Sequence, residues 1–187
     1  MARREPPRRW VALVRAINIG TANRIRMPAL AEVVTAAGCF DVSWHIQTGN
    51  LFLTAPGDRE EVASAIEQQL TRAGLRRADV MVRTPAELAE LVARQPFAAI
   101  DVTEYRCEAS FLRRPPADPA LDRLRGTGCI ITYLDEQTLC VATPRAGALA
   151  GGLTGRIETT WGITATARAW NVVEAIAAKA IALDGQP

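Results

Sequence analysis

The sequence predicts an α+β protein made of two tandem ferredoxin-like lobes, each a βαββαβ unit followed by one more helix. Three observations support this prediction. Short β-branched and apolar runs alternate with segments whose apolar residues recur at helical spacing. The order of these segments is the same in both halves, and the ends of the two halves align with each other. In this arrangement the sheets are antiparallel.

The elements of the first half follow from periodicity and from helix-capping residues. Thr48-Gly49-Asn50 supplies turn chemistry between two strands, and Thr84 with Glu87 forms a capping box. In chain order we expect a strand at Val11–Ile17, a helix from Met27 to Gly38, strands at Val42–Ile46 and Leu51–Thr54, a helix from Asp58 to near Gly74, a strand at Asp79–Arg83 and a helix opened by Thr84.

The second half repeats this order. Its expected elements are a strand at Cys107–Leu112, a helix at Pro119–Leu124, strands at Cys129–Leu134 and Thr138–Thr143, a helical stretch within Leu149–Trp161, a strand at Ile163–Arg168 and a helix at Asn171–Leu183. Val82-Arg83-Thr84 aligns with Ala167-Arg168-Ala169. Because periodicity lapses around Pro96–Glu104, we expect a flexible basic tail at residues 1–9, a first lobe at 10–98 and a second lobe at 99–187.

Composition narrows the function classes. The 187 residues are 49% hydrophobic and carry a net charge of +2, with acids and bases interspersed, so nucleic acid is not the expected partner. No apolar run is long enough to cross a membrane, and the arginine-rich start lacks the features of a signal peptide, which favours a cytoplasmic protein. The sequence carries no signal for an oligomeric state.

Metal, cofactor and nucleophile motifs are not found. The four cysteines lie far apart and are expected to be buried free thiols, and His45 is the sole histidine, so we expect no metal site and no cofactor. Gly147–Arg156 is rich in glycine but lacks the ending of a P-loop, and we interpret it as a mobile loop.

A group of polar residues near strand ends is the candidate site. If Val42, Trp44 and Ile46 face the helices, the residues between them face the opposite side of the sheet. One arginine with several amides suits a carboxylate, a phosphate or a base edge, because arginine offers a bidentate fork and amides both donate and accept. The candidates in the first half are Arg15, Asn18, Gln47 and Asn50. Alternatively, the amides cap turns and Arg15 pairs with an acid across the lobe interface.

These segments resemble the bacterial domain of unknown function 1697 family. Its usual pattern is Arg-Gly-Ile-Asn-Val-Gly-Gly, a Met-x-x-Leu helix, Tyr-Ile-Gln-Ser-Gly-Asn-Val and, near the end, Thr-Arg-Asn-Trp-Asn-Thr-Val. The matching stretches here are Arg15-Ala16-Ile17-Asn18-Ile19-Gly20, Met27-Pro28-Ala29-Leu30, His45-Ile46-Gln47-Thr48-Gly49-Asn50-Leu51 and Ala167-Arg168-Ala169-Trp170-Asn171-Val172-Val173. The resemblance spans nearly the whole chain.

The resemblance implies a two-lobed α+β fold and no established activity. If the family shares a ligand site, the residues retained here are Arg15, Asn18, Gln47, Gly49, Asn50, Arg168 and Asn171. Ala16 replaces a glycine, Thr48 a serine and Ala169 an asparagine. These departures fall partly in the second-lobe half of such a site.

Three functions are compatible with the sequence. The leading hypothesis is binding of a small polar or anionic molecule between the lobes, with Arg168 and Asn171 contributed by the second lobe. The second is an enzyme that uses His45 as its general base. The third is a nucleic-acid-binding protein that uses the basic stretch Arg3–Arg9 and an exposed sheet face. Neither the reaction nor the ligand can be read from the residues alone.

Overall fold

The chain divides into two compact units. A computed structural model describes residues 6–18, 23–117, 121, 124, 128–146 and 153–185. The first unit comprises Met1–Ala89 together with Ile176–Pro187, and the second comprises Glu90–Ala175. The end of the chain therefore groups with the first unit. The divisions fall inside two helices, α3 (Pro85–Ala93) and α6 (Trp170–Asp184), each of which contributes residues to both units.

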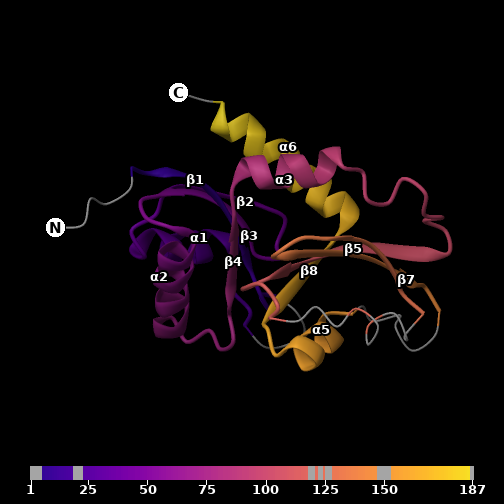
Figure 1. The fold of residues 1–187 in the computed structure, drawn as a ribbon. Coiled ribbons are helices and arrows are strands. Elements are labelled where there is room, and N and C mark those ends of the chain that lie inside the picture. Colours follow the sequence, from indigo (N-terminus) through magenta and orange to yellow (C-terminus); the bar gives the residue numbers. More distant parts are fainter. Residues whose placement is uncertain are drawn as a thin grey trace. The chain divides into compact units, whose positions relative to one another are not determined.

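The first unit contains a four-stranded antiparallel sheet in the order β2-β3-β1-β4, with α1 and α2 on one face (Figure 1). This is the strand order of a βαββαβ unit, with the first strand at the centre. Its elements before α3 are β1 (Arg8–Val14), α1 (Met27–Ala36), β2 (Phe40–His45), β3 (Asn50–Ala55), α2 (Arg59–Arg72) and β4 (Val80–Arg83).

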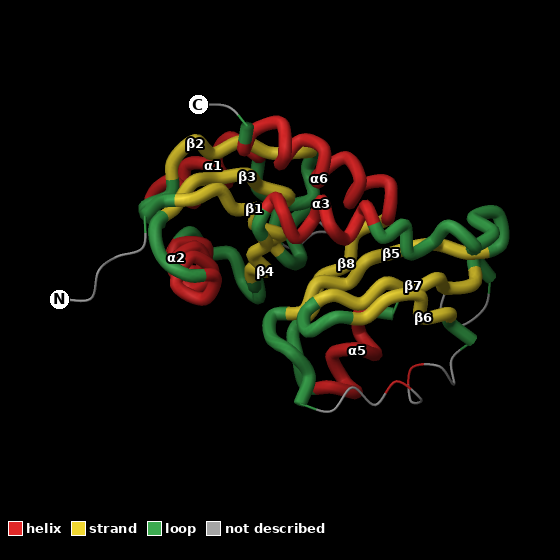
Figure 2. The backbone as a smooth tube through the Cα atoms, turned by 45° about the horizontal axis from the view of Figure 1, so that its top comes forward, coloured by secondary structure: helices red, strands yellow, loops and turns green. Residues whose placement is uncertain are grey.

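The second unit has the equivalent sheet, in the order β6-β7-β5-β8, with α5 against one face (Figure 2). Its elements are β5 (Tyr105–Leu112), β6 (Ile130–Leu134), β7 (Thr138–Pro144), α5 (Thr154–Trp161) and β8 (Ala165–Ala169). The helix expected at Pro119–Leu124 lies outside the described residues except for Leu121 and Leu124. Residues 147–152 of the expected glycine-rich loop also lie outside them. The helical stretch expected within Leu149–Trp161 is α5, which begins at Thr154, so the last three residues of the expected loop are helical.

The two sheets match at the level of individual hydrogen bonds. The bond from Val14 N–H to the Gly49 carbonyl, at 2.8 Å, corresponds to that from Leu112 N–H to the Gln137 carbonyl, also at 2.8 Å. In both β4 and β8 one arginine, Arg83 or Arg168, donates from Nη1 to the carbonyl of the residue before it at 2.8 Å. The predicted fold class and the internal duplication are therefore confirmed.

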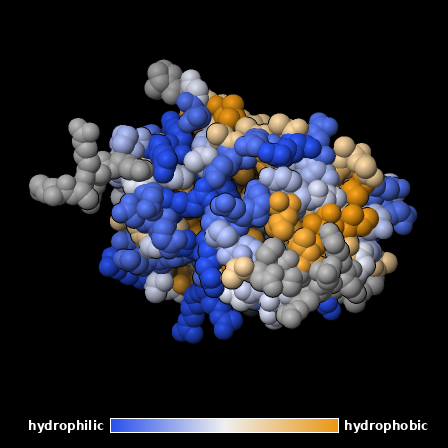
Figure 3. Space-filling view, in the orientation of Figure 1, coloured by the Kyte–Doolittle hydropathy of each residue, from blue (hydrophilic) through white to orange (hydrophobic). Residues whose placement is uncertain are grey.

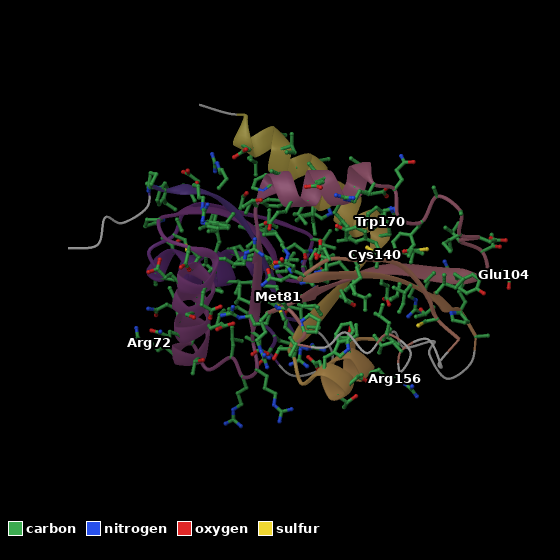
Figure 4. The ribbon with its side chains drawn as sticks, in the orientation of Figure 1. Arg72, Met81, Glu104, Cys140, Arg156 and Trp170 are labelled. Carbon is green, nitrogen blue, oxygen red and sulfur yellow. The ribbon has the colours of Figure 1, made fainter. Side chains whose placement is uncertain are left out.

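Both faces of the first sheet are buried. Trp10, Ala12 and Val14 pack into the core under α1 and α2. On the opposite face Phe52 and Met81 are only 2% and 1% exposed (Figure 4 labels Met81). The part of α6 that belongs to the first unit contacts this side, since Lys179 Nζ lies 5.1 Å from the Phe52 ring centroid. The second face is therefore not the exposed sheet face that the nucleic-acid hypothesis invoked.

The helix starts in the first unit form as the capping residues predict. Asp58 accepts from Glu61 N–H at 2.9 Å, and the Glu61 carboxylate accepts from Asp58 N–H at 2.9 Å, which completes a capping box on α2. Thr84 and Glu87 form the same reciprocal pair on α3. Polar residues cover the outer side of α2, as the hydrophilic surface over this helix in Figure 3 shows.

The first strand differs from its expected bounds at both ends. It begins at Arg8, so Arg8 and Arg9 of the expected tail belong to the sheet, where the Arg8 guanidinium lies 4.2 Å from the Trp10 ring centroid. It ends at Val14 rather than Ile17, because Ala16 and Asn18 adopt positive φ angles of 55° and 57° that an extended strand does not permit.

We expect Gly49→Ala to lower the free energy of unfolding by roughly 2–4 kcal/mol. Gly49 has a φ of 74°, and a Cβ there would lie 2.9 Å from the Val14 carbonyl oxygen, so left-handed strain and a backbone clash would add. Gly74→Ala is the matched control, because Gly74 has a φ of 83° but open space around it, and it should cost about 1–2 kcal/mol. Urea denaturation measures both. Equal costs would contradict the close approach at Gly49.

We expect Glu87→Gln to reduce stability by about 0.5–1 kcal/mol at pH 7 and to have a progressively smaller effect as the pH falls through the lowered pKa of Glu87. Burial alone would raise the pKa of Glu87, but hydrogen bonds from Thr84 and the ion pair with Arg59 outweigh it and hold the pKa below its usual value. The folded protein thus favours the carboxylate, and this stabilisation is lost as pH falls through the lowered pKa. Urea midpoints measured from pH 3 to 7 test this, with the exposed Glu32→Gln as control. A difference between Glu87→Gln and the wild type that is as large at pH 3 as at pH 7 would contradict it.

Candidate functional site

Arg15 lies just past the end of β1 and is held by an ion pair. Its backbone N–H donates to the Asp79 carbonyl at 2.8 Å, and its Nη1 lies 3.4 Å from Asp79 Oδ2. Asp79 directly precedes β4, so the pair links neighbouring strands of one sheet. The guanidinium is half-buried and already has an acidic partner within its own unit.

Asn18 organises the loop after β1 through its side-chain amide. Its Oδ1 accepts from Ile25 N–H at 2.9 Å, and its Nδ2 donates to the Ile25 carbonyl at 3.0 Å and to the Gln47 carbonyl at 2.9 Å. The side-chain amide thus both accepts a hydrogen bond from the Ile25 backbone and donates one to it, as the backbone of a neighbouring strand residue would. One side chain fixes the segment before α1 and the turn after β2.

Asn23, which the sequence also places among the amides near strand ends, has a comparable structural role. Its Oδ1 accepts from Arg76 N–H at 2.9 Å, and its Nδ2 donates to the Arg76 carbonyl at 2.5 Å and to the Ala16 carbonyl at 3.2 Å. Its φ of 51° suits asparagine better than most residues. Two amides together therefore anchor the start of the α1 segment to the rest of the unit.

Asn50 is fully buried at the start of β3. Its Nδ2 donates to the His45 carbonyl at 3.2 Å and to Thr48 Oγ1 at 3.0 Å, which closes the turn between β2 and β3. The structure therefore gives Asn50 a role in the hairpin. Gln47, in the same turn, has an exposed side chain.

A cavity of about 780 Å³ lies where these segments meet, within the first unit. Of the four candidates from the first half, Asn18 and Gln47 line it, whereas Arg15 and Asn50 are not among its described lining residues. The lining residues are Asn18, Arg24, Ile25, Arg26, Met27, Pro28, Trp44 and Gln47.

Two arginines at this cavity were missed as site residues by the sequence analysis. Arg24 and Arg26 are exposed and stand immediately before α1, where Arg26 is the N-cap residue. The available signal was the Arg24-Ile25-Arg26 stretch directly ahead of a helix whose first turn contains Pro28 and no acid. Basic residues in loops are common, so only the fold shows that these two line a cavity.

Arg168 and Asn171 belong to the other compact unit. Arg168 is 8% exposed, and its Nη1 donates to Thr166 Oγ1 at 2.7 Å and to the Ala167 carbonyl at 2.8 Å. Burial lowers the pKa of its guanidinium to about 10, which leaves it protonated at neutral pH. Asn171 is exposed in the first turn of α6. All of the described residues that line the 780 Å³ cavity belong to the first unit.

The other chemically reactive side chains lie elsewhere. His45 ends β2 half-buried and is not among the described residues that line the cavity. All four thiols are free, and three are buried as expected, whereas Cys107 is half-buried. Burial raises the pKa of Cys39 to about 11 and that of Cys140 to about 12, which disfavours the nucleophilic thiolate.

The part of the chain that the structure describes lacks two further features. Within these residues no group of three or more histidine, cysteine or acidic side chains is placed to hold a metal ion. In the same residues no helix combines the length and apolar character needed to cross a membrane.

We expect Asn18→Ala to lower the free energy of unfolding by roughly 2–4 kcal/mol. The variant loses three hydrogen bonds worth about 1 kcal/mol each and places alanine at a positive φ. Asn18→Gly removes the same bonds without the φ penalty, so urea denaturation should show it about 1 kcal/mol more stable than Asn18→Ala. Unchanged stability in both variants would show that the amide does not hold the loop.

Comparisons with known proteins identify a fold and a family but no activity. A search of curated proteins finds no match. The structure is similar to that of the conserved bacterial protein SP0830 from Streptococcus pneumoniae, with a TM-score of 0.63 and 16% sequence identity, covering 92% of this chain and 98% of that one. At this identity the likeness shows the fold alone. The model of a family described as protein of unknown function DUF1697 matches residues 8–129, well over half of the chain. The chain therefore belongs to the DUF1697 family, as its motifs predicted.

Proposed function

We propose that the first unit binds a small anionic molecule in the cavity at the start of α1. The observation that supports this proposal is the charge of the cavity. Arg24 and Arg26 line it, and its described lining residues include no carboxylate. A cavity of about 780 Å³ also falls within the range of roughly 300–1,000 Å³ that is typical of small-molecule sites.

The start of α1 adds to this positive potential. The N-cap residue Arg26 makes no side-chain capping hydrogen bond within the described residues, and the first turn of α1 contains no acidic residue. The helix dipole therefore favours negative charge at this end. The dipole supplements the two guanidinium groups, which can form charge-assisted hydrogen bonds with carboxylate or phosphate oxygens.

The predicted site residues divide into two roles in this proposal. Asn18 is a positioning residue, because both ends of its amide already bond to backbone groups that shape the cavity. Gln47 offers an exposed side-chain amide at the lining and is the predicted ligand contact that this cavity uses. The wider hypothesis, in which Arg168 and Asn171 complete a site from the second lobe, stays a prediction.

The two alternative functions gain less support. The enzyme hypothesis relied on His45, which is not among the described lining residues. The nucleic-acid hypothesis relied on the basic N-terminal stretch, in which Arg8 lies over Trp10 and Arg9 lies 3.6 Å from Asp41. Both of these arginines belong to β1, so neither extends as a solvated arm.

We expect the wild-type protein to bind inorganic pyrophosphate and Arg26→Gln to bind it about tenfold more weakly. The expected loss corresponds to about 1.4 kcal/mol, the order of one charge-assisted hydrogen bond. Isothermal titration calorimetry at about 50 and 200 mM salt measures the affinity, which should fall with salt if exposed charges attract the anion.

Arg72→Gln is the matched control, since Arg72 lies exposed on the outer side of α2 and does not line the cavity (Figure 4). It changes the net charge by the same amount and should leave the affinity for pyrophosphate within twofold of the wild type. If Arg26→Gln and Arg72→Gln weakened binding equally, the proposed location would be wrong. Absence of pyrophosphate binding to the wild type would overturn the proposal.

A further inference from the structure

We infer that the ligand of this cavity is a phosphate monoester that carries a flat aromatic ring, of the nucleoside monophosphate class. The inference rests on the proposed anion site and extends it to the substrate class. It comes from the apolar residues that line the cavity together with the arginines. These are Trp44, Met27 and Pro28, and Ile25 adds a partly buried aliphatic side chain.

Trp44 is held in place by its surroundings. Its side chain packs against the core under α1 while it also lines the cavity. Its backbone carbonyl accepts from Lys179 Nζ at 2.7 Å, so α6 fixes the strand that carries it. A tryptophan that is already ordered loses little further entropy when a ring packs on it, which favours binding of planar groups.

The lining residues are of two kinds, two guanidinium groups and several apolar side chains, and together they suit a ligand with two different parts. A phosphate alone would interact with Arg24 and Arg26 but would leave the indole and the proline in contact with water. An uncharged aromatic compound would contact the apolar side chains only. A phosphate monoester with an aromatic ring would contact both the guanidinium groups and the apolar side chains. The Gln47 amide can donate to and accept from a base edge or a sugar hydroxyl.

A single mononucleotide fits this lining better than a polymer. Proteins that bind single-stranded nucleic acid stack successive bases on several aromatic side chains along a basic groove. Trp44 is the one aromatic residue among the described residues that line the cavity. The lining therefore provides one ring position and one anionic position.

The test compares probes that carry the phosphate, the aromatic base or both. The four ribonucleoside 5′-monophosphates, ribose 5-phosphate, adenosine and a six-residue oligoribonucleotide are titrated against the full chain by calorimetry. We expect at least one monophosphate to bind about tenfold more tightly than ribose 5-phosphate, because base–aromatic stacking contributes about that factor. Adenosine should bind more weakly than AMP.

Variants then test whether Trp44 is the residue that contacts the aromatic base. Trp44→Leu should remove the preference for the monophosphate over ribose 5-phosphate and leave the affinity for ribose 5-phosphate within twofold. Trp44→Phe retains a ring, so it should keep most of the preference and guards against a folding defect in the leucine variant. Trp161→Leu, at a half-buried tryptophan of the second unit, is the control and should change neither affinity.

The outcomes separate this inference from the proposed function. Suppose that the monophosphates and ribose 5-phosphate bind with equal affinity and that Arg26→Gln still weakens both. This result would contradict the inference that the ligand carries an aromatic ring, but it would leave the proposed anion site in place. Tighter binding of the oligoribonucleotide than of any monophosphate would overturn the mononucleotide class. Failure of every phosphorylated probe to bind would overturn both proposals.

Discussion

The candidate site depends on how the chain leaves β1, the central strand of the first sheet. Two backbone hydrogen bonds of 2.8 Å, from Val14 N–H to Gly49 and from Arg15 N–H to Asp79, close the pairing of β1 with both of its neighbours. The chain then turns away through residues with positive φ. Because β1 is buried on both faces, the path of its end is strongly constrained, and the side chain of Asn18 can hold the returning segment at a fixed place.

The duplicated units share this framework but differ in the segment after the first strand. Arg113 N–H donates to the Thr164 carbonyl at 2.9 Å, as Arg15 does to Asp79, so the two strand ends correspond. Counting on from these matched arginines, Pro116 stands at the position of Asn18. Proline has no side-chain amide, so it cannot accept a hydrogen bond from the backbone of a later segment and donate one to it as Asn18 does. Duplication thus preserved the sheet, whereas the amide-held loop belongs to the first unit.

The structural similarity to SP0830 at only 16% identity has a physical explanation in this framework. A split βαββαβ unit needs apolar residues on the core faces, turn residues between elements and helix starts that satisfy free N–H groups. Many sequences meet these requirements. The capping pairs Asp58–Glu61 and Thr84–Glu87 act locally and do not specify a ligand. For that reason the fold carries less information about function than the cavity lining does.

Most of the fold could be predicted from the sequence, because periodicity, caps and turns are local. The bounds of several strands differ from those expected, and β1 differs at both ends; its apolar run continues to Ile17 while the chain turns after Val14. Of the six candidate site residues, Asn18 and Gln47 line the cavity, while Arg15 pairs with Asp79 and Asn50 is buried. Residue type alone does not tell whether an amide bonds to backbone or to a ligand.

The sequence by itself determined the order of the elements, the duplication and the family, because these depend on local patterns and motifs. Only the tertiary structure decided which polar groups are used internally and which line a cavity. Arg24 and Arg26 line the cavity because Asn18 holds their segment close to Gln47. That placement joins parts of the chain about twenty residues apart in sequence, and long-range contacts of this kind form only when the sheet and its helices pack together.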